Sequence, residues 1–238
     1  ESSVGVVIDG VYRPRNGVSF GDLGELQRVE VLKGPQGTLF GKNTSAGVIN
    51  ILSVAPSFNF GADGEVTVGN YGARGVSGSI TGPLTSDQTL AGRLFFATRQ
   101  RDGYLDVVTG TAGPRTQKDD VNQDFWTARG QLLFVPNDDL KIRVIADYTS
   151  RDESCCLATQ LVVGDAATSR ANYINAVRPG SIDTSERPFE RNAYANRDTG
   201  QYIVDTGFSA QADWDLIDDI TMTSITAWRN WRAETGQD

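Results

Sequence analysis

Residues 28–52 read RVEVLKGPQGTLFGKNTSAGVINIL, and this stretch decides the fold. Val29 and Val31 alternate with charged residues, which is the period-two pattern of a strand with one apolar and one charged face. Gly34 and Pro35 end that strand, because proline has no backbone N–H to donate. A β-branched run at residues 48–51 then resumes an extended conformation. The stretch therefore predicts a strand, a loop punctuated by glycines and a second strand.

The same loop ends in Gly41 and Lys42, which suggests the phosphate cradle of a nucleotide-binding protein. A P-loop requires a glycine five residues before the Gly-Lys pair and a serine or threonine directly after it. Those two positions hold Gln36 and Asn43. The spacing therefore excludes a P-loop.

The order of residues in this stretch strongly resembles the second half of the plug domain of TonB-dependent outer-membrane receptors. In that family a similar run reads roughly E-R-V-E-V-L-R-G-P-Q-G-T-L-Y-G-R-N, followed by a glycine pair and I-N-I-I-T-K-K-P. Here Lys33 and Lys42 replace arginines, Phe40 replaces a tyrosine and Ala46 replaces a glycine. Residues 53–56, SVAP, replace the closing T-K-K-P, so the exit from the plug departs most from the family pattern.

Composition restricts the function of the 238 residues. The formal net charge of -8 argues against nucleic-acid binding, which requires a basic patch. Histidine is absent, and this removes the commonest general base and a common metal ligand. We expect no catalytic residue, no cofactor and no metal site, and we do not expect an enzyme. The sequence contains no run of about 18 apolar residues, so we expect no transmembrane helix. A membrane-spanning strand needs only about 9–11 residues and is not excluded.

After a linker at residues 56–64, the sequence from Glu65 onward alternates between apolar and polar residues in about seven strands. Short periplasmic turns are expected near Gly82, Pro136 and Asp218, and external connections near Tyr71 and at residues 102–120 and 151–199. In the last strand, Met222 and Trp228 share one face while Ile225 and Trp231 share the other, so we expect a bulge there. This arrangement is typical of an up-and-down outer-membrane barrel.

The predicted fold is therefore mainly β. Residues 1–56 are expected to form the C-terminal half of a plug domain, with a small mixed sheet. Residues 57–238 are expected to form the first of the antiparallel, up-and-down transmembrane β-barrel strands. A soluble β-sandwich or β-helix with one wet face would show the same alternation. Arginines on the inner face favour the barrel, because they suit a polar lumen that faces a plug.

The resemblance implies charged contacts between plug and barrel that hold the plug and yet allow its release. On the plug strand the expected members of this latch share one face, and they are Arg28, Glu30 and Lys33. The expected members on the barrel wall are Arg93, Arg129, Arg143 and Asp147. Buried pairs of this kind fix registry more reliably than they add stability. The alternative is that the charged face of this strand is merely solvated.

The resemblance also implies a ligand site at the top of the plug, after the D-G-V-Y element at residues 9–12. The expected ligand-binding residues are Tyr12, Arg13, Arg15 and Asn16. The alternative is a solvated turn whose arginines pair with carboxylates of the barrel.

Cys155 and Cys156 are adjacent in the third external connection. Adjacent cysteines can close only into a strained vicinal disulfide, because neighbouring Cα atoms lie closer than the usual disulfide range. A thiolate metal site, free thiols or a cysteine partner elsewhere remain alternatives. Four acidic pairs are expected to be solvated carboxylates at turns or loop edges, with a loop calcium site as the alternative. They are Asp119-Asp120, Asp138-Asp139, Asp152-Glu153 and Asp218-Asp219.

By resemblance, the function is TonB-dependent active transport of a scarce, bulky ligand across the bacterial outer membrane, with a ferric siderophore or another iron chelate as the commonest cargo. The expected partners are the TonB–ExbB–ExbD complex, outer-membrane lipid and lipopolysaccharide, and the chelate. No signal peptide is visible at Glu1, so we expect the signal peptide, the TonB box and the first half of the plug to precede this chain. The alternatives are a soluble extracellular glycan-binding β protein and a passive porin.

Overall fold

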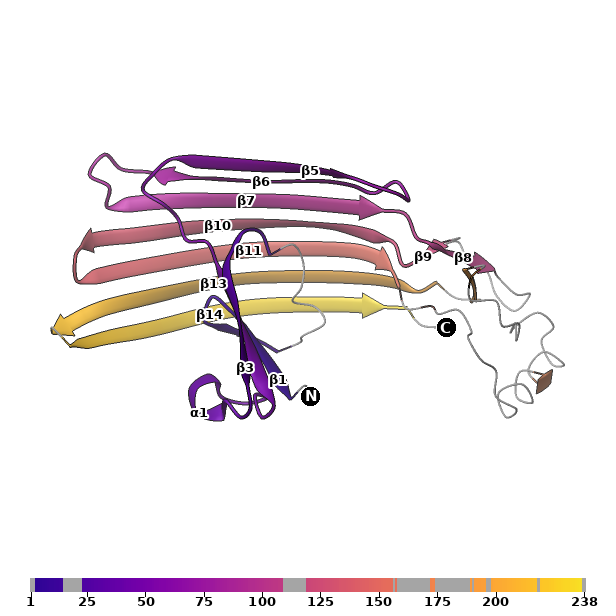
Figure 1. The fold of residues 1–238 in the computed structure, drawn as a ribbon, viewed down its shortest axis with the longest axis horizontal. Coiled ribbons are helices and arrows are strands. Elements are labelled where there is room, and N and C mark those ends of the chain that lie inside the picture. Colours follow the sequence, from indigo (N-terminus) through magenta and orange to yellow (C-terminus); the bar gives the residue numbers. More distant parts are fainter. Residues whose placement is uncertain are drawn as a thin grey trace.

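A computed structural model describes residues 3–14, 23–108, 119–155, 157, 172–173, 189, 191–195, 198–217 and 219–236. Two sheets account for most of these residues (Figure 1). The N-terminal sheet has four strands in the order β2-β1-β4-β3, of which β1 and β4 run parallel and the other neighbours antiparallel. Its elements are β1 (Val4–Ile8), β2 (Val11–Arg13), β3 (Leu26–Lys33), the short helix α1 (Gly37–Phe40) and β4 (Gly47–Ser53).

The N-terminal sheet forms because two apolar runs, in β1 and β4, bury their side chains against each other. Val6, Ile8 and Ile51 make up the buried cluster, with Leu23 and Ile49 packed around it. The strand–loop–strand predicted for residues 28–52 is confirmed as β3, a loop with α1, and β4.

The start of β4 depends on a close backbone approach to β3. A Cβ atom on Gly47 would lie 2.5 Å from the carbonyl oxygen of Leu32, closer than any side chain tolerates. Only glycine at this position lets β3 and β4 pair at their ends.

The large sheet has seven antiparallel strands, each paired with its neighbour along the chain. These are the seven strands that the alternation predicts. They are β5 (Gly61–Val68), β6 (Arg74–Pro83), β7 (Leu90–Arg101), β10 (Gln123–Asn137), β11 (Leu140–Ser154), β13 (Gly200–Ile217) and β14 (Ile220–Thr235).

Residue parity divides the large sheet into two faces of different character. Odd-numbered side chains form the inner face, which lies against the N-terminal sheet, and even-numbered side chains form the outer face. Buried members of the inner face include Ala91, Arg93, Ala97, Phe125, Thr127, Gln131, Leu133, Ile145 and Ile203. Exposed apolar members of the outer face include Val66, Val76, Ile80, Leu94, Phe96, Trp126, Leu132, Phe134, Phe208, Trp214, Met222 and Trp228.

Two expectations about the strands are wrong in detail. The first barrel strand begins at Gly61 rather than near Glu65, because residues 61–64 pair with residues 78–81 of β6 although their small side chains show no alternation. The last strand has no bulge between Met222 and Trp231, because β14 pairs with β13 without interruption from Thr221 to Thr235, and the register of this pair shifts only beside the turn, between Asp215 and Ile217. Ile225 instead points inward, where it contacts Gly10 of the N-terminal sheet.

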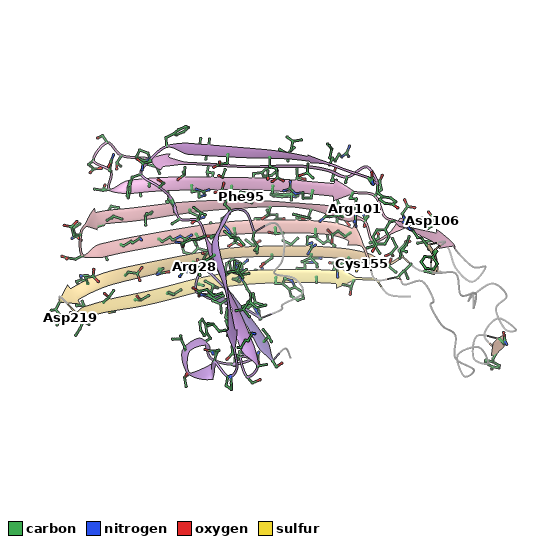
Figure 2. All side chains as sticks on the ribbon, viewed as in Figure 1. Arg28, Phe95, Arg101, Asp106, Cys155 and Asp219 are labelled. Carbon is green, nitrogen blue, oxygen red and sulfur yellow. The ribbon has the colours of Figure 1, made fainter. Side chains whose placement is uncertain are left out.

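The two ends of the large sheet differ in their connections. The turns that join β6 to β7, β10 to β11 and β13 to β14 lie at the left end in Figure 1, and Asp219 marks this end in Figure 2. At the other end, here named the long-connection end, a small third sheet is formed by β8 (Leu105–Val108), β9 (Asp119–Asp120) and β12 (Asn192–Tyr194). In the part of the chain that the structure describes, no helix has the length and apolar character needed to cross a membrane.

Candidate functional site at the contact between the two sheets

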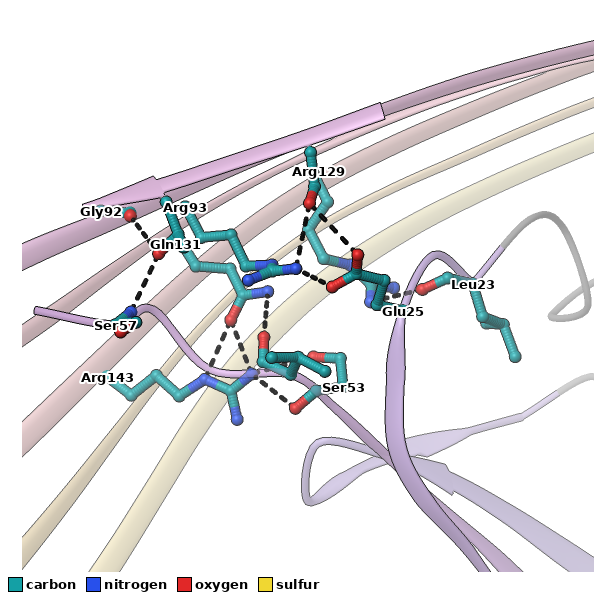
Figure 3. A network of polar contacts seen from close by, with 12 residues as sticks. Leu23, Glu25, Ser53, Ser57, Gly92, Arg93, Arg129, Gln131 and Arg143 are labelled. Carbon is teal, nitrogen blue, oxygen red and sulfur yellow. Dashed lines mark hydrogen bonds and ion pairs between the residues drawn. The ribbon is translucent and has the colours of Figure 1, made fainter. Parts of the chain in front are cut away.

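Four polar side chains project from the inner face of the large sheet toward the N-terminal sheet: Arg93, Arg129, Gln131 and Arg143 (Figure 3). They stand on β7, β10 and β11, at odd positions of neighbouring strands. Their shared chemistry is hydrogen-bond donation, since a guanidinium has only donors and an amide has two. The inner face therefore presents donors to whatever covers it.

The acceptors for these donors come from two short segments of the N-terminal domain, residues 23–25 and 53–54. Arg129 donates to the carbonyl of Leu23 at 3.2 Å, and Arg93 makes an ion pair with Glu25. The two segments are themselves joined, because the backbone N–H of Val54 donates to the carbonyl of Glu25 at 3.1 Å. Much of this side of the contact consists of backbone oxygens.

Arg143 is the most heavily bonded donor. Its Nη2 donates to Ser53 Oγ at 2.8 Å and to Gln131 Oε1 at 2.6 Å. Gln131 in turn donates from Nε2 to the carbonyl of Val54 at 3.2 Å, so both ends of this amide are used. Arg143 Nη1 also lies 3.5 Å from Asp9 Oδ1.

Asp9 extends the network into the N-terminal sheet. Its carboxylate accepts from the Ser53 backbone N–H at 2.9 Å and from the Ser53 hydroxyl at 2.8 Å. Its backbone φ is 49°, a left-handed conformation that aspartate tolerates in tight turns. Asp9 thus joins the β1–β2 turn, the end of β4 and the wall through Arg143.

A second buried cluster joins β2 to β11, β13 and β14. Arg229 makes a two-pronged contact with Asp147, at 2.7 and 3.0 Å, and also lies 2.7 Å from Asp205. Arg13 of β2 approaches Asp205 more loosely, at 3.7 Å. The cluster therefore places two arginines against two carboxylates at the sheet–sheet contact.

Arg13 is poorly satisfied in this cluster. Its residue is 5% exposed, and Nε and Nη1 are buried without a hydrogen-bond partner. Burial lowers the pKa of Arg13, while the charges of Asp147 and Asp205 act to raise it. Arg13 is thus a cation held by nearby charge rather than by directed hydrogen bonds.

The plug side of the expected latch does not meet the large sheet in the residues that the structure describes. Arg28 pairs at 2.6 Å with Glu30 on its own strand, since residues two apart on a strand share a face. A hydrogen bond from Arg28, followed by one from Asn50, lowers the pKa of Glu30. Lys33 is exposed, and for none of the three does the structure give a contact with the large sheet in the described ranges.

The wall residues of the expected latch lie at the contact, but with other partners. Arg93, Arg129 and Arg143 bind the residues named above, and Asp147 binds Arg229 of its own sheet. That these contacts act as a releasable latch stays a prediction. The partners that sequence reasoning missed are Asp9, Leu23, Glu25, Ser53, Val54, Asp205 and Arg229.

The expected ligand residues separate in the structure. Arg13 is buried, and the hydroxyl of Tyr12 accepts a hydrogen bond from Asn43 Nδ2 at 3.0 Å. Arg15 and Asn16 lie outside the described residues, so their role stays a prediction. For Arg13 the alternative expectation, an arginine paired with a barrel carboxylate, describes the observed contact better than an exposed ligand site does.

Cys155 is disulfide-bonded. Its expected partner, Cys156, lies outside the described residues, and the vicinal ring therefore stays a prediction. Among the residues that the structure describes, no group of three or more histidine, cysteine, aspartate or glutamate side chains could hold a metal ion.

Comparison with known proteins supplies the family. Residues 1–48 match the TonB-dependent Receptor Plug Domain family. The ferrioxamine B receptor of Salmonella typhimurium is 34% identical over 80 residues, which cover 34% of this chain and 11% of that receptor. The ferripyoverdine receptor of Pseudomonas aeruginosa is 25% identical over 181 residues, which cover 76% of this chain and 21% of that receptor.

Solved structures show the same fold over nearly the whole chain. The ferric yersiniabactin uptake receptor of Yersinia pestis superposes with a TM-score of 0.72 at 19% identity, covering 97% of this chain and 32% of its own. The pyoverdine outer-membrane receptor of Pseudomonas aeruginosa superposes with a TM-score of 0.71 at 19% identity, covering 97% of this chain and 31% of its own. The chain thus spans about a third of these receptors' length. Residues 1–48 therefore belong to the plug-domain family of TonB-dependent receptors, and the large sheet has the fold of the corresponding strands in these receptors.

Proposed function

We propose that the receptor containing this chain takes up a ferric siderophore, or a related iron chelate, across the bacterial outer membrane by TonB-dependent active transport. The observation that carries the proposal is the plug-domain match over residues 1–48, together with the plug's hydrogen bonds to one face of a sheet of barrel strands. The cargo class follows the relatives, which are receptors for ferrioxamine B, pyoverdine and yersiniabactin.

The outer face of the large sheet supports a place in the membrane. Many of its even-numbered side chains are apolar and exposed over neighbouring strands, as lipid contact requires. Trp126 stacks on Tyr148 with ring centroids 4.8 Å apart, and Phe96 lies 6.4 Å from Trp126. Such aromatic clusters suit the boundary between hydrocarbon and head groups, where lipid and lipopolysaccharide would be the neighbours.

The unequal ends of the large sheet support an orientation. In outer-membrane barrels the short turns face the periplasm and the long connections face outward. The long-connection end would then receive the ligand, and the short-turn end would face the TonB–ExbB–ExbD complex.

The polar character of the plug contact supports displacement of the plug during transport. Each hydrogen bond contributes only about 0.5–1.5 kcal/mol net, because water replaces it when the contact opens. Arg129, Gln131 and Arg143 meet plug oxygens that water can equally well satisfy. A pulling force could therefore break such contacts one after another without exposing a large apolar surface.

Uptake in a host without siderophore receptors tests the function. The full-length receptor is produced in a Gram-negative strain that lacks its own receptors, and cells receive ferrioxamine B, ferripyoverdine or ferric yersiniabactin loaded with radioactive iron. We expect accumulation of at least one chelate, and we expect it to fall to background when a protonophore collapses the proton gradient. Uptake that persists without the gradient would indicate a passive porin, and a receptor that stays monomeric without detergent would indicate the soluble glycan-binding alternative.

The burial of Arg13 predicts a small effect on ligand affinity. Replacing Arg13 with alanine should change the dissociation constant of the transported chelate by less than about threefold, because a buried side chain offers the ligand no contact surface. Equilibrium binding to the purified full-length receptor measures this. A loss of tenfold or more would return Arg13 to the ligand site.

A further inference from the structure

Asp120 is a buried carboxylate at the long-connection end that the proposed function does not use. It lies in β9, within the connection from β7 to β10, and is 0% exposed. One of its oxygens accepts a hydrogen bond from the hydroxyl of Thr199, and the other lies 3.5 Å from the backbone N–H of Leu157. Leu157 follows β11 and Thr199 precedes β13, so Asp120 binds both ends of the next long connection.

Backbone hydrogen bonds surround this carboxylate. The N–H of Val121 donates to the carbonyl of Ser154 at 2.8 Å, which ties the first connection to the end of β11. The N–H of Cys155 donates to the carbonyl of Thr199 at 3.1 Å, which brings the two ends of the second connection together. Farther out, β8 and β12 pair in parallel, which adds a short ladder between the two connections. Figure 2 shows Asp106 of β8 at the same end of the sheet as Cys155.

The turn between β5 and β6 joins this assembly through aromatic contacts. The guanidinium of Arg191 lies 5.7 Å from the ring centroid of Tyr71, and the rings of Tyr71 and Tyr104 meet edge to face at 6.4 Å. The N–H of Asp102 also donates to the carbonyl of Tyr71 at 2.8 Å. Three outer connections therefore meet at this end.

We propose that Asp120 fastens the connections at the long-connection end into one unit and thereby positions the residues that form the entrance for the ligand. The ligand-positioning part rests on the proposed function, whereas the fastening part does not. Asp120 acts as a positioning residue, because a fully buried carboxylate cannot contact the ligand itself. Its two carboxylate oxygens serve two different donors, Thr199 and Leu157, whereas an asparagine at this position offers only one acceptor oxygen, so one of these hydrogen bonds is lost and the structure around it is weakened.

The chain offers a matched control beside this residue. Asp119 precedes Asp120 on the same strand and carries the same charge, but its side chain is exposed. The sequence predicts two equivalent solvated carboxylates here, and the structure corrects this for Asp120, which strand alternation turns inward.

The first test is independent of ligand. In the full-length receptor, trypsin is applied to intact cells, since Arg115, Lys118 and Arg170 are cleavage sites within the two connections. We expect Asp120→Asn and Thr199→Val each to speed cleavage by about tenfold, because local opening becomes easier. The double variant should cleave no faster than the faster single variant, while Asp119→Asn and Thr199→Ser should match the wild type.

The second test measures affinity for the transported chelate. Asp120→Asn and Thr199→Val should each raise its dissociation constant by about tenfold, and Asp119→Asn should leave it within about twofold. Wild-type cleavage rates in Asp120→Asn, or effects of the two variants that simply add, would overturn the fastening role. Faster cleavage with unchanged affinity would overturn the positioning role. A wild-type receptor that binds no chelate would contradict the proposed function. In that case the trypsin result would still decide whether Asp120 fastens the connections.

Discussion

Replacing Arg143 with alanine is expected to lower the free energy needed to open the plug by about 3 kcal/mol. The substitution removes hydrogen bonds to Ser53 and Gln131 and leaves Asp9 without its arginine. The side chain of Asp9 is only 6% exposed, so water cannot readily replace the lost partner. Removal of one member of a buried ion pair is costly because the other charge stays buried and uncompensated.

Hydrogen exchange of the backbone amides of β4 measures this effect in the full-length receptor in detergent. The exchange rate of a protected amide reports the free energy of local opening. Arg74→Ala is the matched control, since Arg74 is exposed on the large sheet and bonds Gln100 rather than the plug. Equal protection of β4 in Arg143→Ala and Arg74→Ala would contradict the assigned role of Arg143.

The alternation of the sequence was sufficient to predict the seven strands and, except in β14, the residues on each face. Arg93 and Leu94 illustrate the reason: neighbours on a strand point to opposite faces, and here the two faces meet different surroundings. Residues 61–64 have mostly small side chains that show no alternation, so the start of β5 was predicted near Glu65 instead of at Gly61.

The partners at the plug contact could not be predicted in the same way. Arg129 and Gln131 bind backbone carbonyls of Leu23 and Val54, and a carbonyl leaves no mark in the sequence. Asp120 and Thr199 lie 79 residues apart, so their contact depends on the meeting of two connections rather than on local pattern. Arg28 was expected to contact the barrel wall because its charge needs a partner, but Glu30 on the same strand face already supplies that partner.

The sequence does contain one sign of the second buried cluster, in which Arg229 binds Asp147 and Asp205. This sign is Gly207 in the interior of β13. Glycine inside a strand often marks a close approach by another group. A Cβ atom at Gly207 would lie 2.0 Å from Nη1 of Arg229, so the guanidinium crosses β13 through the space that glycine leaves. This crossing lets Arg229 of β14 reach Asp147 of β11.

Gly207→Ala is therefore expected to lower the free energy of unfolding of the receptor by about 3 kcal/mol, because the methyl group displaces Arg229 from two buried carboxylates. Urea titration of the full-length receptor in detergent measures this. Gly130→Ala is the control: its Cβ atom on the outer face would meet Leu94 at an ordinary 3.5 Å, and the change should stay within about 0.5 kcal/mol.

A double-mutant cycle identifies the cause of the loss. In an Arg229→Ala background the guanidinium that the methyl group displaces is gone, so adding Gly207→Ala should cost less than about 0.5 kcal/mol further. If Gly207→Ala cost as much there as in the wild type, the loss would come from the strand itself. The buried charges would then not be the reason that position 207 requires glycine.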